Sequence, residues 1–159
     1  MLGEAADQEA KRMYEFVDRH PAALGSTSRF LLWAMRGWTQ ARANQACAPM
    51  TLYRGFSSAG ATAALSDFHI AMILLNGDAL ERLTLAPMSC GRICEDEAVL
   101  LALWQGVGRE NSTLVGGTLE RLVKEEAVRP TARAMAACGT QLVMAGFDLM
   151  ETRTRKIKD

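Results

Sequence analysis

Two cysteines and one histidine are the residues of this chain best suited to binding a metal or to catalysis. Cys90 and Cys94 lie four positions apart, directly before three consecutive acids, and His69 lies within an apolar segment. Thiolates and imidazoles are ligands that zinc prefers, and both groups also serve as nucleophiles or bases. The sequence therefore indicates a candidate metal site made of Cys90, Cys94 and His69, with zinc as the candidate ion.

The spacing of these residues departs from the usual zinc patterns. Structural zinc sites take about four ligands, commonly as two pairs at short fixed spacings. This chain has a single cysteine pair, whose spacing differs from those patterns, and its only further thiols are Cys47 and Cys138. Buried or half-buried cysteines are therefore the favoured interpretation.

A reactive thiol is the second chemical interpretation of the same segment. A helix N-terminus near Cys94 would lower the pKa of its thiol, whereas the acids at 95–97 would raise it. A disulfide between Cys90 and Cys94 fits a loop, but it does not fit a reducing compartment. No arrangement of Ser, Asp and Cys in the sequence completes a catalytic triad with His69. The favoured interpretation of His69 is therefore a histidine in the core, or at its margin, that makes one hydrogen bond.

Composition restricts the class of protein. The chain has 159 residues, of which 49% are hydrophobic and 23% charged, so one globular domain over residues 1–150 is expected rather than disorder. Eighteen basic residues balance eighteen acidic ones, whereas a dedicated nucleic-acid binder usually has a basic excess. Residues 151–159 are predicted to form a charged, solvated tail, and nucleic-acid contact through that tail is the lowest-ranked function.

The location expected from the sequence is the cytoplasm. The sequence has an acidic residue within its first few positions, and it lacks a basic segment followed by an apolar run. No secretory signal is therefore predicted. The longest apolar stretch, residues 70–75, is much shorter than the roughly 20 residues that span a bilayer. Four sparse cysteines are then expected to be free thiols.

Apolar residues recur at helical spacing throughout, in segments separated by Pro, Gly and Asn. A helix capped by Ser26 or Ser28 is expected to end before Pro49, and residues 50–60 are either a short helix or extended. Asn76-Gly77 is predicted to end a helix in left-handed geometry. The other helices are expected over about residues 4–19, 61–75, 79–84, 95–106, 113–124 and 130–145.

These elements indicate an all-α protein, a compact helical bundle of about five to seven helices. Residues 88–94 are expected to be an irregular linker, and no convincing strand pattern is present. The last helix is rich in alanine and glycine, which permits close approach of another helix within the protomer or across a dimer.

One segment resembles a known group of proteins. Residues 83–90 place a proline and a cysteine before Cys94 and the acidic helix start at 95–98. This arrangement resembles small uncharacterised bacterial helical proteins in which a Pro/Cys segment precedes an acidic helix start. The chain departs from that pattern at Met88-Ser89, where a tighter cysteine cluster would be expected. The resemblance implies a bacterial cytoplasmic protein and no particular activity.

The function expected from the sequence is a non-enzymatic protein-interaction or regulatory module that forms a homodimer. This expectation rests on the wide apolar faces of several helices and on the small residues of the final helix. The sequence also has no recognisable set of catalytic residues. The alternative is a small-molecule, metal or redox-thiol site near His69, Cys90 and Cys94. No membrane partner is expected.

Overall fold

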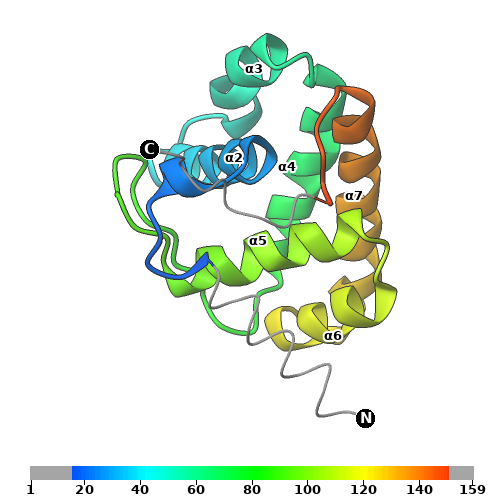
Figure 1. Cartoon of the computed structure of the whole chain (residues 1–159). Helices are drawn as coiled ribbons and strands as arrows, with labels where there is room; N and C mark the ends of the chain where they lie inside the picture. The colour runs from blue at the N-terminus through cyan, green and yellow to red at the C-terminus, as the bar shows by residue number, and fades with distance from the viewer. Residues whose placement is uncertain (1–15, 151–159) are drawn as a thin grey trace.

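The computed structural model describes residues 16–150, and these residues form a helical bundle (Figure 1). A 3-10 turn, η1, precedes six α-helices that account for nearly all of the secondary structure in this range. Their bounds are η1 Pro21–Ala23, α2 Ser26–Ala43, α3 Ala48–Ser58, α4 Thr62–Gly77, α5 Glu95–Gly108, α6 Ser112–Leu122 and α7 Glu125–Met144. The predicted all-α bundle is confirmed.

Helices α4 and α7 lie side by side and make the most extensive contact of any described helix pair. The end of α4 meets the start of α7, because Lys124 N–H donates to the carbonyl of Asp78 over 2.9 Å. The two helices are therefore antiparallel. Small residues of α7, Ala127 and Ala134, are buried, as close packing of two helices requires.

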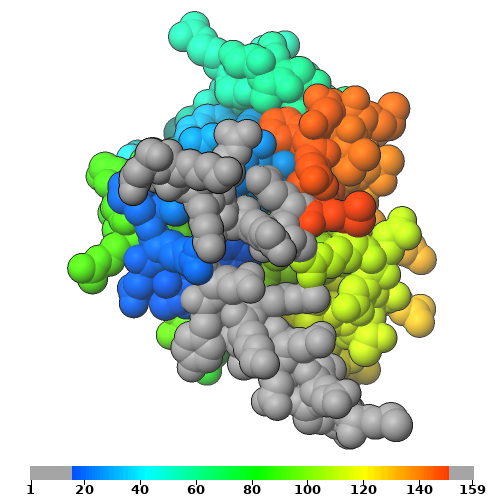
Figure 2. Space-filling view, viewed as in Figure 1, coloured from blue at the N-terminus to red at the C-terminus, as the bar shows by residue number. Residues whose placement is uncertain are grey.

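The remaining helices complete the bundle around one core. In Figure 1, α2 lies to the left of α4, α5 runs across the molecule below α2, and α6 lies below α5. In the space-filling view, α3 stands at one end of the molecule (Figure 2). The core is aromatic where α4 meets α3 and α5, because Phe68 packs on Phe56 and stacks on Trp104. No helix within the described range is long and apolar enough to cross a membrane.

Several predicted boundaries are wrong. Gly25, not Ser26 or Ser28, caps α2. The predicted end of that helix before Pro49 is confirmed, since α2 ends at Ala43. Pro49 lies in the first turn of α3, a position that needs no N–H donor, and of the two alternatives for residues 50–60 the short helix is the one present. Gly77 stays helical, because Asp78 is the C-cap of α4 and no left-handed residue ends that helix.

Two further expectations about helices are corrected by contacts between elements. Residues 79–84 do not form a helix, because Leu80 N–H donates to Leu122 O and Ala79 pairs with Val123 as an isolated antiparallel bridge. The last helix begins at Glu125 rather than near Pro130, which lies inside α7. The predicted tail and most of the predicted helix over residues 4–19 lie outside the described residues.

Candidate functional site

A buried ion pair between Arg36 of α2 and Glu97 of α5 is the most concentrated polar feature among the described residues. Arg36 Nε donates to Glu97 Oε2 over 2.6 Å, and Nη2 donates to Oε1 over 2.9 Å. The two residues are 3% and 0% exposed. This two-point contact matches the fork of a guanidinium to the two oxygens of a carboxylate.

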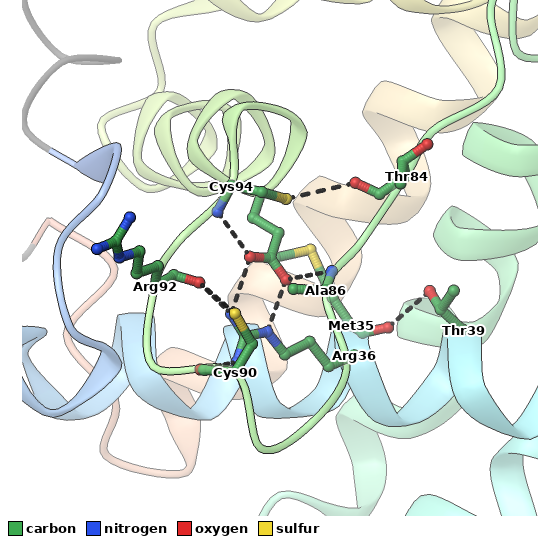
Figure 3. Close-up of polar contacts among 9 residues, drawn as sticks. Met35, Arg36, Thr39, Thr84, Ala86, Cys90, Arg92 and Cys94 are labelled. Atoms are coloured by element: carbon green, nitrogen blue, oxygen red, sulfur yellow. Dashed lines mark hydrogen bonds and ion pairs between the residues drawn. The ribbon is translucent and has the colours of Figure 1, made fainter.

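The pair also binds the backbone of the loop that carries the two candidate cysteines (Figure 3). The Arg36 guanidinium donates to two loop carbonyls, those of Cys90 over 2.9 Å and Arg92 over 2.8 Å. Glu97 accepts from two loop N–H groups, those of Cys94 over 3.0 Å and Ala86 over 3.2 Å. An otherwise irregular segment is thus fixed to α2 and α5 by one charged pair.

Both partners are stabilised in their charged forms. Burial by itself would raise the pKa of Glu97, but hydrogen bonds from Arg36 and Cys94, together with the charge of Arg36, lower it. The hydrogen bond to Glu97 raises the pKa of Arg36 despite its burial. A carboxylate held in this way stays ionised at neutral pH, so the pair is suited to holding the loop rather than to exchanging protons.

The two candidate thiols lie at this cluster and bond to carbonyls. Cys94 Sγ donates to Thr84 O and Cys90 Sγ donates to Arg92 O, each over 3.4 Å. Burial is the main cause that raises the pKa of the Cys94 thiol, and the charge of Glu97 adds to it. The thiolate, which is the reactive form, is therefore disfavoured at Cys94.

His69 lies on α4 and is engaged by α2. Trp38 Nε1 donates to His69 Nδ1 over 2.9 Å, and the guanidinium of Arg42 lies 5.4 Å from the centre of the Trp38 ring. Burial, followed by the charge of Arg42, lowers the pKa of His69. The imidazole is neutral at neutral pH, and it serves as the hydrogen-bond acceptor of a largely buried tryptophan.

The structure brings Cys90 and Cys94 to the same cluster but leaves His69 in a different set of contacts. Over residues 16–150, no group of three or more His, Cys, Asp or Glu side chains is placed to hold a metal ion. Of the remaining cysteines, Cys47 is exposed and Cys138 is buried, with burial raising the pKa of the Cys138 thiol to about 12.

Sequence reasoning missed Arg36 and assigned Glu97 only to the positive end of a helix. Arg36 lies four positions after Leu32 and so shares the apolar side of α2, where an unpaired charge would be strongly unfavourable. That position was the available signal for a buried partner. Its identity was not readable, because Glu97 is 61 positions away in the sequence.

Large apolar side chains, in contrast, lie exposed on three helices. Met50 and Tyr53 of α3 and Ile70 and Ile73 of α4 each form a pair one helical turn apart. Two further exposed residues, Val143 and Met144, lie at the end of α7. Exposed apolar pairs such as those of α3 and α4 are typical of surfaces that bind other proteins, whereas single exposed apolar residues are common in monomers.

Comparisons with known proteins give no family for this chain. No protein-family model matches it, and neither the curated proteins nor the solved structures contain a significant match.

Proposed function

We propose that this chain is a non-enzymatic, helical protein-interaction module that forms a homodimer. The observation that carries the proposal is the exposure of large apolar side chains on regular helices, above all the paired isoleucines of α4. Isolated exposed apolar residues are common in monomers, but pairs on one helical face make a surface that a partner can cover.

The contacts of the candidate chemical groups support the same proposal. The Glu97 carboxylate is bound by Arg36 and the loop backbone, and Nδ1 of His69 accepts from Trp38. The raised pKa of Cys94 disfavours a nucleophilic thiolate. Each of these groups has a structural role that accounts for its position, which favours binding through the surface over chemistry at this cluster.

The expected cytoplasmic location is kept as part of the proposal. All four cysteines are free thiols, as a reducing compartment would keep them, and this supports the location.

Sedimentation velocity of the full chain over a broad concentration range tests the proposal. We expect a reversible monomer–dimer equilibrium, with the weight-average sedimentation coefficient rising as concentration increases. A sedimentation coefficient that stays at the monomer value up to several hundred micromolar, well above the dissociation constants of weak interfaces, would overturn the homodimer.

A further inference from the structure

Helix α4 carries an exposed seam with the spacing of a coiled coil. From Ala63 onward, its exposed positions alternate by three and four residues over four turns, which keeps them on one line along the helix. The seam consists of Ala63, Ser66, Ile70, Ile73 and Gly77. Its two large residues are prominent, with Ile70 exposed to 44% and Ile73 to 41%.

The seam contains no charged residue. The only Asp, Glu, Lys or Arg in α4 is Asp67, and its charge contributes to the raised pKa of Cys138 on α7. Asp67 is therefore on the side of α4 that faces α7, and it flanks the seam one helical turn from Ala63 and from Ile70. In comparison, the outer side of α7 exposes Glu126, Arg129 and Arg133.

We propose that the seam of α4 binds the seam of α4 in a second copy of this chain. This inference rests on the proposed homodimer and assigns its interface. In a two-fold interface the same surface meets itself, so a charge that lies at the axis faces its own like charge. An axis at Arg129 or at Arg133 on the outer side of α7 would meet that repulsion, whereas an axis at Ile70 on the seam of α4 would not.

The residue sizes along the seam fit an antiparallel pairing about Ile70. With the two-fold axis at Ile70, Ala63 of one copy lies opposite Gly77 of the other, while Ser66 and Ile73 are offset from each other by one residue. Small residues at both ends allow the helices to approach, while the isoleucines fill the centre. A single-helix seam buries less than the roughly 800 Å² per partner of a standard interface, so we expect dissociation in the micromolar range.

Charge substitutions on the seam test this assignment. We expect Ile70→Glu and Ile73→Glu each to raise the dimer dissociation constant at least about 100-fold, because each places two like charges in an apolar contact. The matched control is Val143→Glu on α7, where the native side chain is 55% exposed and lies off the seam. This control should dimerise as the unchanged chain does, and circular dichroism should show that all three variants keep their helices.

A mixing experiment tests specifically whether the two-fold axis of the dimer lies at Ile70. Ile70→Glu and Ile70→Lys should each be monomeric alone, and an equimolar mixture should recover a heterodimer, since position 70 of one copy faces position 70 of the other. Failure of the mixture to dimerise would overturn this pairing.

The outcomes separate the interface from the homodimer itself. Dimerisation of the unchanged chain that persists in Ile70→Glu and Ile73→Glu would reject the seam and leave the proposed function intact. An equal loss of dimer in Val143→Glu would also reject the seam. A monomeric unchanged chain would reject both proposals.

Discussion

Glu97 accepts four hydrogen bonds, two from the Arg36 guanidinium and two from backbone N–H groups of Ala86 and Cys94. A buried charge left without its partner is strongly unfavourable, whereas an apolar replacement of a whole ion pair is often tolerated. Here the pair also binds loop backbone groups, so its removal has consequences beyond the two side chains.

Glu97→Gln is therefore expected to lower the free energy of unfolding by about 3–5 kcal/mol, because it leaves the Arg36 charge buried and uncompensated. Urea denaturation measures the change. The matched control is Glu95→Gln, the same substitution at an exposed first-turn acid, which should lower stability by less than about 1 kcal/mol. Equal effects of the two substitutions would contradict a structural role for the buried pair.

Acid should weaken the fold through the same carboxylate. The pKa of Glu97 is lowered in the folded chain below its ordinary value of 4.5, so the unfolded chain binds a proton first as pH falls. The contribution of Glu97 is thus complete above pH 4.5 and is lost as pH falls below it. Urea titrations from pH 6 to pH 3 should show a steeper loss of stability for the unchanged chain than for Glu97→Gln, and parallel curves would argue against this origin.

Thr131 offers a test in the opposite direction. Its side chain is 0% exposed, and its Oγ1 is a buried oxygen without a hydrogen-bond partner among the described residues. An unsatisfied hydroxyl in the core destabilises a fold, and valine has nearly the same shape. We expect Thr131→Val to raise stability by about 1 kcal/mol, which thermal unfolding would register as an increase of roughly 2–4 °C. A clear decrease would mean that the hydroxyl has a partner.

At the scale of elements, the periodicity of apolar residues predicted five of the six α-helices of the described residues and left α3 open. The three acids before the apolar run correctly placed the start of α5. The predicted start near residue 113 is within a residue of that of α6, where the Asn111 side chain accepts from Leu114 N–H over 3.2 Å. Local capping chemistry depends on neighbouring residues only, and these two starts could therefore be predicted from the sequence.

The errors arose where contacts between distant segments outweigh local preference. Residues 79–84 lack a helix because their backbone pairs with the α6–α7 connection. Pro130 is tolerated inside α7, which is held along α4 by packing. The candidate site follows the same rule, since the cysteine loop was predicted to be irregular, but its attachment to Arg36 depends on tertiary structure.

A segment that follows α7 is held by two glycines on different helices. Leu149 lies against Gly108 of α5 and Gly139 of α7. A Cβ atom added to Gly108 would lie 2.4 Å from the nearest atom of Leu149, and one added to Gly139 would lie 2.9 Å from the Leu149 side chain. The Leu149 side chain is buried there, and a Cβ at Gly108 would also come within 2.6 Å and 2.7 Å of the backbone O and C atoms of Leu149, which have little room to move. Glycine is thus required at position 108 by packing.

Gly108→Ala should therefore destabilise the chain by about 1–3 kcal/mol through overpacking. Gly117→Ala in α6 is the matched control, because no atom lies within 4 Å of its added Cβ. Alanine is the better helix former, so this control should gain about 0.5–1 kcal/mol. Thermal unfolding of both variants would show changes of opposite sign, and a gain at both positions would contradict the tight contact with Leu149.

At the scale of the whole molecule, the polar and apolar features have separate places. The charged pair is buried between α2 and α5, where it fixes the cysteine loop, and the uncharged seam faces solvent on α4. Buried polar networks add specificity to a fold when every member has a partner, while uncovered apolar area favours association. This division supports a rigid module whose surface, rather than its interior, meets a partner.

Methyl NMR of the isoleucines tests the self-association of α4 most directly. The chain has four isoleucines, with Ile70 and Ile73 on the seam, Ile93 fully buried, and Ile157 outside the described residues. As protein concentration rises through the dissociation constant, the δ1-methyl signals of Ile70 and Ile73 should shift while that of Ile93 stays in place. Seam signals that do not change with concentration, in a chain that sedimentation shows to dimerise, would contradict the α4 interface.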